Sequence, residues 1–133
     1  MENMKLIGSK FTKIIAERKP NFTGKLNINT NIQIKDLEKV EELKDTLRIS
    51  YNFEVTYNGL GSINIEGTIF ISTPSKTIKE LLKSWKDKQF NTPEHIQITN
   101  YIIQKSSIKA FELEEELGLP IHIRLPTLSP KKD

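Results

Sequence analysis

The sequence contains no cysteine, which excludes disulfide bonds and thiolate metal sites. It also lacks any apolar run near the length of about 18 residues that a membrane-spanning helix requires, so we expect no membrane insertion. The first residues, Met1–Lys5, do not show the charged, apolar and small segments of a secretory signal peptide. These absences together predict a cytoplasmic protein.

A large excess of charge of one sign is absent as well. The chain has 20 Lys and Arg against 17 Asp and Glu, a net charge of +3, and its lysines are spread along the sequence. Nucleic-acid-binding domains commonly gather basic residues on one face, so this balance favours a role in solubility. The amides at alternate positions from Asn27 to Gln33 keep nucleic-acid binding open as an alternative.

Motifs for catalysis are also missing. The sequence has no nucleophile elbow, no paired-histidine zinc motif and no glycine-rich phosphate loop. Its two histidines, His95 and His122, are expected to face solvent, one on the first turn of a helix and one in an extended tail. The acidic run Glu112–Glu116 is expected to form a solvated helix face. We therefore expect no enzyme, no cofactor, no metal site and no small-molecule substrate.

Alternation between apolar and polar residues is the strongest pattern that the sequence does have. It covers residues 26–35, 47–57 and 63–71, and each stretch places its aliphatic side chains on one side of a strand. Asn58-Gly59, between the second and third stretches, is a strong hairpin signal. Residues 5–17 predict a fourth strand. The sequence thus predicts a four-stranded antiparallel β-meander with one covered face and one polar face.

Helical spacing replaces this alternation after the third stretch. Apolar residues at i, i+3, i+4 and i+7 predict an amphipathic helix over 74–88, capped by Thr73. A second start signal, Thr92-Pro93, predicts a long helix over 93–117 that ends at Gly118. The predicted class is therefore α+β, with a short and a long C-terminal helix covering one face of the sheet.

The remaining segments connect these elements. The charged linker 36–45 is predicted to form a short helical turn or a long crossover loop. Two Leu-Pro pairs, at 119–120 and 125–126, predict an extended, proline-braced tail. All segments together predict a single domain over residues 1–133, with the sheet at 5–72, the helices at 74–118 and the tail at 119–133.

The long helix carries apolar residues on more faces than a four-stranded sheet can cover. The surplus requires the other helix, the tail or a second copy of the chain, and self-association is the most economical solution. Small residues in the middle of the helix would allow another helix to approach closely. The residues predicted at the resulting oligomer interface are Ile96, Ile103, Ser107, Ala110 and Leu117.

Aromatic residues gather on the covered face of the predicted sheet and near the short helix. They are predicted to form the core or, as a group, to line an apolar groove where the sheet meets the helices. Gly67 leaves room on the covered face because it has no side chain. The candidates for such a groove are Tyr51, Phe53, Tyr57, Phe70, Trp85 and Phe90.

The order of these parts resembles the SecB-like proteins, particularly the small archaeal members. One part of the likeness runs from Asn100-Tyr101 through the end of the long helix to Leu119-Pro120. It continues over Ile121–Pro126, and the predicted hairpin over 47–71 fits the central hairpin of the family. In all, the resemblance spans residues 24–128.

The resemblance implies a tetramer, a dimer of dimers, in which the helices are sandwiched between sheets. It also implies an ATP-independent holdase that keeps unfolded or precursor polypeptides in apolar grooves, with a link to protein export. Bacterial export chaperones of this family are acidic and carry a further C-terminal helix, whereas this chain is basic and ends at Asp133. The likeness therefore does not extend to hand-off to a SecA-type motor. The alternatives are an oligomeric module with one dedicated protein partner and a nucleic-acid-binding domain.

Overall fold

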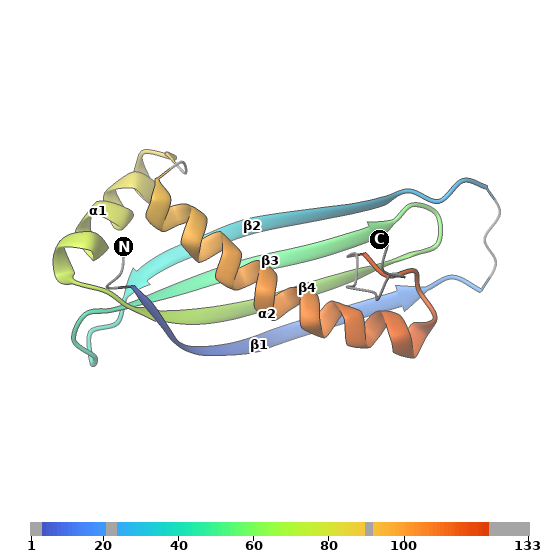
Figure 1. Cartoon of the computed structure of the whole chain (residues 1–133), viewed down its shortest axis with the longest axis horizontal. Coiled ribbons are helices and arrows are strands. Elements are labelled where there is room, and N and C mark those ends of the chain that lie inside the picture. Colours follow the sequence, from blue (N-terminus) through green and yellow to red (C-terminus); the bar gives the residue numbers. More distant parts are fainter. Residues whose placement is uncertain (1–3, 21–23, 90–91, 123–133) are drawn as a thin grey trace, which may run out of the picture.

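The molecule has two layers, a sheet of four antiparallel strands and a layer of two helices (Figure 1). The computed structural model describes residues 4–20, 24–89 and 92–122. Within these residues, neither helix combines the length and the apolar character needed to cross a membrane. The elements in chain order are β1 (Lys5–Arg18), β2 (Ile28–Lys39), β3 (Thr46–Tyr57), β4 (Gly61–Ser72), α1 (Ser75–Lys86) and α2 (Pro93–Leu117).

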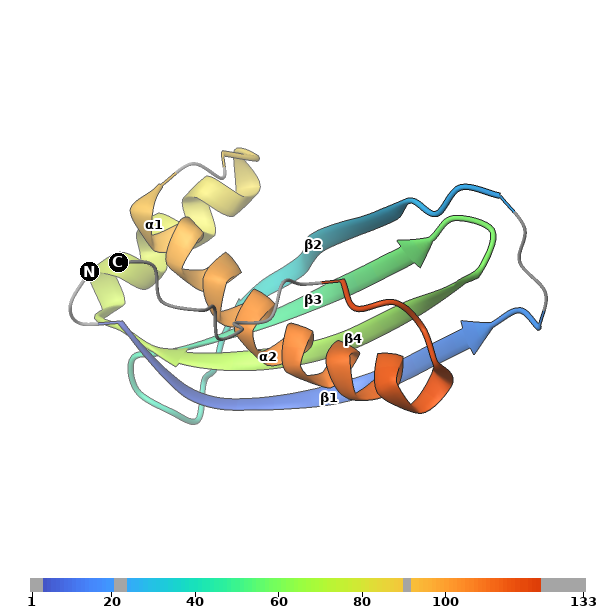
Figure 2. The same ribbon diagram turned by 45° about the vertical axis from the view of Figure 1, so that its right-hand side comes forward.

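The sheet has the strand order β1-β4-β3-β2. Strands β2, β3 and β4 form the predicted meander, and β1 pairs with β4, so β1 and β2 are the two edges. Helix α2 crosses one face obliquely from the β2 side to the β1 side, while α1 lies at one end of the sheet beside β2 (Figures 1 and 2). The predicted α+β class with a half-covered antiparallel sheet is confirmed.

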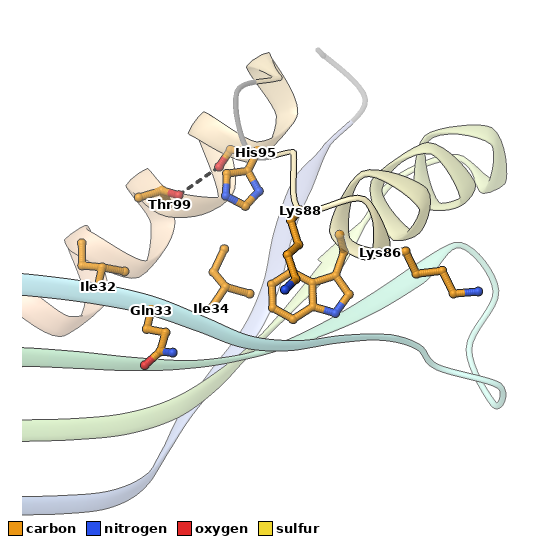
Figure 3. Close-up of a pocket in the computed structure, with 8 residues that line it drawn as sticks. Ile32, Gln33, Ile34, Lys86, Lys88, His95 and Thr99 are labelled. Carbon is orange, nitrogen blue, oxygen red and sulfur yellow. Dashed lines mark hydrogen bonds between the residues drawn. The ribbon is translucent and has the colours of Figure 1, made fainter.

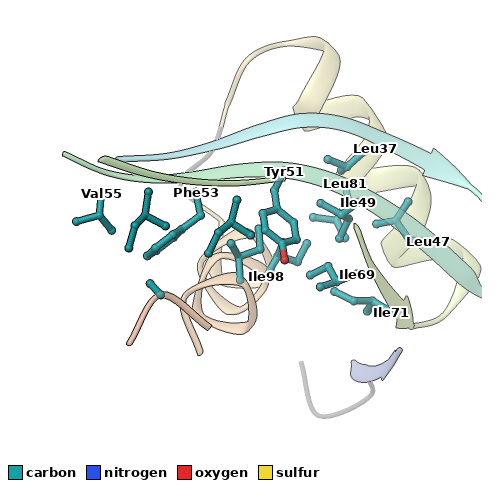
Figure 4. Packing of buried hydrophobic residues seen from close by; sticks show 14 of the residues in the cluster. Leu37, Leu47, Ile49, Tyr51, Phe53, Val55, Ile69, Ile71, Leu81 and Ile98 are labelled. Carbon is teal, nitrogen blue, oxygen red and sulfur yellow. The ribbon is translucent and has the colours of Figure 1, made fainter. Parts of the chain in front are cut away.

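The core lies between the sheet and α2, and the alternation in β3 and β4 builds it. Residues opposite each other in an antiparallel pair point to the same face, so pairs such as Val55 with Ile63 and Ile49 with Ile69 stack beneath the helix (Figure 4). These side chains are fully buried. Burial of each one contributes about 1.5–3 kcal/mol, which makes the two central strands the main source of stability.

Strand β2 is longer than predicted. A β-bulge between Ile34 and Asp36 adds one residue, and the strand then continues to Lys39. The bulge shifts the phase of the alternation, so that Leu37 faces the core opposite Ile49. The prediction of a helical turn or crossover loop over 36–45 is therefore wrong for its first four residues. The bulge interrupts the alternation of apolar and polar residues, so the strand pattern ends there in the sequence.

The caps and turns follow the predicted chemistry with two differences. Thr92 caps α2 by accepting a hydrogen bond of 3.0 Å from the backbone N–H of His95, and Gly118 ends the helix with φ +70°. Helix α1, however, begins at Ser75 with Pro74 in the cap position, one residue later than predicted. In the hairpin between β3 and β4, Gly59 adopts a positive φ of 82° whereas Asn58 does not.

Gly67 is required by a close contact between neighbouring strands. It lies opposite Tyr51 on β3, and a Cβ atom at this position would lie 2.5 Å from the Tyr51 hydroxyl and 2.8 Å from the Lys10 carbonyl oxygen. The space that the sequence analysis assigned to a groove is thus filled by the Tyr51 ring, which is 1% exposed. Tyr51 in turn packs against α2 within the core.

Replacing Gly67 with alanine is expected to lower the free energy of unfolding by about 1–3 kcal/mol, because overpacking forces the Tyr51 ring and β1 to move. Urea denaturation followed by circular dichroism measures this difference. The matched control is Gly8→Ala, whose Cβ would lie 3.6 Å from the Phe70 ring, an ordinary contact. Equal stabilities of the two variants would contradict the packing argument.

Candidate functional site

An open groove lies where β2 meets the end of α1 and the beginning of α2 (Figure 3). Its volume is about 710 Å³. The apolar floor of the groove is formed by Ile32 and Ile34 on β2 and by Trp85 on α1. The polar groups around them are Gln33, Lys86, Lys88, His95 and Thr99.

The groove is open because α2 leaves the inner face of β2 partly uncovered. Ile32 and Ile34 are half-buried, whereas Phe53 and Tyr51, their partners on β3, are 1% exposed. The apolar residues on this half of β2 therefore face a cavity instead of a helix. The same alternation that builds the core on β3 thus produces an accessible apolar surface on β2.

A second hollow of about 600 Å³ continues this surface past the tryptophan. It is lined by Leu37 of β2, by Leu82 and Lys83 of α1, and by Asp36. Trp85 and Lys86 line both hollows. We call the two hollows together the β2 groove. Three lysines and one aspartate surround its apolar floor, so the local charge is positive.

The sequence predicted that His95 faces bulk solvent. The histidine instead lies within this groove. Its backbone N–H donates to the Thr92 hydroxyl, and its carbonyl oxygen accepts a hydrogen bond of 3.1 Å from Thr99. Burial lowers the pKa of the imidazole below its usual value of 6.5. The ring is therefore neutral at pH 7, and the positive charge of the groove comes from its lysines.

A buried polar cluster lies at the other end of α2, around Glu114. The Glu114 side chain is fully buried, and its Oε2 accepts hydrogen bonds from the Tyr57 hydroxyl and from the backbone N–H of His122 at 3.1 Å. His122 Nδ1 lies 2.8 Å from the same oxygen, and its Nε2 lies 3.3 Å from the Ser107 hydroxyl. The His122 ring also meets Phe53 edge-on, with centroids 5.9 Å apart.

The predictions that Glu114 and His122 face solvent are both wrong. Gly118 turns the chain back after α2, and the Leu119 N–H bonds to the Glu114 carbonyl oxygen. Residues 119–122 consequently lie against the last turns of the helix and cover the Glu114 side chain. Two side chains that were expected to be exposed, Glu114 and His122, are thus brought together in the interior by one reversal of the chain.

Ser107, His122 and Glu114 contact one another in the order of a hydrolase triad, but the surroundings do not match that chemistry. Ser107 lies in the middle of α2, where the backbone N–H groups are engaged by the helix and cannot form an oxyanion hole. It is 7% exposed and lines neither hollow of the β2 groove. The cluster instead anchors residues 119–122 to α2 and β3. Elsewhere in the described residues, no group of three acidic or histidine side chains could hold a metal ion.

The structure separates the predicted groove residues. Trp85 lines the β2 groove, whereas Tyr51, Phe53 and Tyr57 belong to the core. Phe70 lies on the opposite, outer face of the sheet, beside Gly8 and Arg48. Phe90 lies outside the described residues. Ile32 and Ile34 line the groove but were not predicted to do so, because their alternation is the same as that of core residues.

The predicted interface residues divide along the length of α2. Ser107 and Ala110 are buried within the chain itself, and Leu117 is half-buried. Ile96 and Ile103 are 54% and 37% exposed. The face that these five residues share is therefore uncovered in the first half of the helix, and in the second half it is covered by the chain itself. Further large exposed apolar side chains, which were not predicted, are Ile108 on α2 and Ile7, Phe11, Ile14 and Ile15 on β1.

No family description matches the sequence, and no curated protein is similar to it. The fold is nevertheless that of the SecB-like chaperones. The chain is similar to Mycobacterium tuberculosis Rv1957, a SecB-like chaperone solved in complex with a ChAD peptide from the Rv1956 HigA1 antitoxin, with a TM-score of 0.64. The match covers 96% of this chain and 91% of that chain at 8% sequence identity. At this identity the likeness establishes the fold, and the resemblance to archaeal members stays a prediction.

The Tyr57 hydroxyl gives the polar cluster a measurable pH dependence. Burial, together with the adjacent Glu114 carboxylate, raises the pKa of this phenol well above its usual value of 10.0. The folded state therefore holds the proton more tightly than the unfolded state. The protonated Tyr57 hydroxyl therefore contributes fully to the free energy of unfolding below about pH 10. Above this pH its contribution decreases by up to about 1.4 kcal/mol per pH unit.

The variant Tyr57→Phe is expected to remove this alkaline contribution, although it also costs stability at neutral pH because Glu114 loses one donor. Urea denaturation at several pH values between about 8 and 11 compares the variant with the native chain. The difference between their unfolding free energies should shrink above about pH 10. A constant difference across this range would contradict the assignment of a buried Tyr57–Glu114 hydrogen bond.

Proposed function

We propose that this protein is a chaperone that binds unfolded polypeptide segments in the β2 groove without ATP. The observation that carries the proposal is the open apolar floor formed by Ile32, Ile34 and Trp85, beside the central strands β3 and β4, whose inner side chains are buried. The shared fold adds support, because a SecB-like chaperone of this fold holds a peptide. The proposal involves no catalytic step and places the activity in the cytoplasm.

The size of the groove indicates weak binding at a single site. Transfer of one large apolar side chain from water contributes about 1.5–3 kcal/mol. Ordering each flexible side chain of the client costs about 0.5–1.5 kcal/mol, and association itself has a further cost. A few side chains in one groove therefore give a short-lived complex. Several grooves on one assembly would hold a long client more tightly through effective concentration.

The proposed assembly is a homo-oligomer, with a dimer of dimers as the arrangement expected from the fold. Two surfaces support it. Helix α2 exposes Ile96 and Ile103 along one side, and the edge strand β1 exposes apolar residues on its length. An unpaired apolar edge is a site for strand pairing with another chain. A link to protein export stays a prediction from the resemblance alone.

A second candidate function is the binding of one dedicated protein partner. It is favoured by the complex of the similar chaperone with a peptide from a single antitoxin. Both candidates use the same groove but differ in breadth. Affinity capture from cell extract distinguishes them, because one stoichiometric partner indicates a dedicated complex and many substoichiometric clients indicate a general chaperone.

The chaperone activity is expected to suppress light scattering when a chemically unfolded model enzyme is diluted in the absence of ATP. The variant Ile32→Asp places a charge on the groove floor and should weaken the suppression about tenfold or more, equivalent to one lost apolar contact. Leu43→Asp is the matched control, because Leu43 is 52% exposed in the turn before β3. No suppression by the native chain at several-fold molar excess would remove the chaperone proposal.

The oligomer is tested by light scattering coupled to size exclusion. We expect a mass four times that of the 15.3-kDa chain. Ile103→Glu and Ile14→Lys place charges on the α2 and β1 surfaces, and each should shift the mass to a smaller species. The variant Leu43→Glu changes an exposed apolar residue outside both surfaces and should leave the mass unchanged. A monodisperse monomer for the native chain would overturn the proposed assembly.

A further inference from the structure

We propose that the β2 groove selects extended client segments in which a short apolar stretch is bordered by acidic residues. The inference rests on the proposed function, since it names the class of polypeptide that the groove prefers. It goes beyond that function because an apolar groove by itself distinguishes clients only by their hydrophobicity. The selectivity comes from the distribution of charge around the apolar floor.

The charged groups that line the groove are predominantly basic. Lys86 and Lys88 line the larger hollow (Figure 3). Lys83 lines the smaller one. All three lysines are exposed. Asp36 is the acidic group among the residues that line either hollow. Long lysine side chains can pack their methylene groups on an apolar surface and keep the ammonium in water, which suits the rim of an apolar groove.

The positive charge of the groove is independent of its histidine at neutral pH. The lowered pKa of His95 leaves that ring uncharged, so it contributes a hydrogen-bonding group and no net charge. Glu80, in the middle of α1, and Glu94, in the first turn of α2, line a separate, smaller cavity. A basic segment entering the β2 groove would therefore meet three lysines, whereas an acidic one would find complementary charge.

The free edge of β2 explains why the client should be extended. Strand β2 pairs with β3 on one side, and within the described residues no strand lies along its other edge. Backbone groups of an edge strand can pair with an added peptide strand. Regular geometry is available from Ile28 to Ile34, where the bulge begins. Alternate side chains of a peptide laid there would enter the groove above Ile32 and Trp85.

The magnitude of the charge preference follows from the exposure of the lysines. Exposed ion pairs are individually weak and are screened by salt. Three such pairs acting together predict a preference of about tenfold for acidic over basic flanks at low ionic strength. The apolar contacts should be almost unaffected by salt. The preference is therefore expected to disappear at high salt while binding itself persists.

The test uses three fluorescein-labelled peptides with the same apolar centre and with acidic, neutral or basic flanks. Fluorescence anisotropy with the full-length protein at neutral pH measures their dissociation constants at low salt and at about 0.5 M salt. We expect the acidic peptide to bind most tightly and the basic peptide most weakly at low salt. The order should be lost at high salt.

Charge-reversed variants locate the effect. Lys86→Glu combined with Lys88→Glu should reverse the order of the peptides. The control, Lys25→Glu combined with Lys44→Glu, makes the same change of net charge at two exposed positions outside the groove and should keep the native order. Far-UV circular dichroism establishes that both variants are folded before they are compared.

The outcomes separate this inference from the proposed function. Equal binding of all three peptides overturns the charge selectivity and leaves the chaperone proposal standing. An acidic preference that persists in the Lys86/Lys88 variant, or that is lost equally in the Lys25/Lys44 control, also overturns it, because the preference would then come from the overall charge. If none of the peptides binds the native chain, the proposed function fails together with the inference.

Discussion

The structure depends on the mismatch in width between a four-stranded sheet and a single covering helix. The outer strands of such a sheet lie about 14 Å apart, whereas one helix with its side chains is about 10 Å wide. Helix α2, with 25 residues, meets this constraint by crossing the sheet obliquely. Together with α1 and residues 119–122, it covers the inner face of β3 and β4 and leaves part of each edge strand open. The half-buried isoleucines of β2 and the exposed apolar residues of β1 follow from this geometry.

The buried carboxylate of Glu114 holds one end of this arrangement in place. A charged group in the interior is costly unless it is paired and hydrogen-bonded. Here Tyr57 comes from β3, and His122 comes from the segment that follows α2. Removing one partner of such a buried hydrogen bond leaves the other unsatisfied, which typically costs about 1–3 kcal/mol. The cluster thus ties the helix, the sheet and the returning chain together at the end opposite the β2 groove.

The two ends of α2 consequently have different character. Toward its C-terminal end, the face that carries Ile96 and Ile103 continues with Ser107 and Ala110. Both of these residues are buried, and His122 of the returning chain contacts Ser107. At its N-terminal end, Ile96 remains on the surface and His95 lies in an open groove. This asymmetry suits the proposed function, because the N-terminal half of α2 remains available for contacts with a client or another subunit. The C-terminal half contributes to stability through its buried cluster. The modest affinity of one groove is the physical reason why such a chaperone would gain from assembly.

Much of the fold could be predicted from local patterns. The alternation of β3 and β4, the helical spacing of α1 and the caps of α2 at Thr92 and Gly118 are short-range signals, and each requires only the residues of its own element. The site could not be predicted in this way. Whether a residue such as Ile32 lines a groove, or one such as Phe53 fills the core, depends on the path of a helix that is some 60 residues away in the sequence.

The sequence by itself determined the secondary structure, the apolar face of the sheet and the α+β class, because periodicity and capping act over a few neighbouring residues. The tertiary structure alone decided which apolar surfaces remain open. It also decided that Glu114 and His122 are buried partners and that Tyr51 occupies the space above Gly67. The physical reason is that burial is set by the relative width and crossing direction of the packed layers, and no single element carries that information.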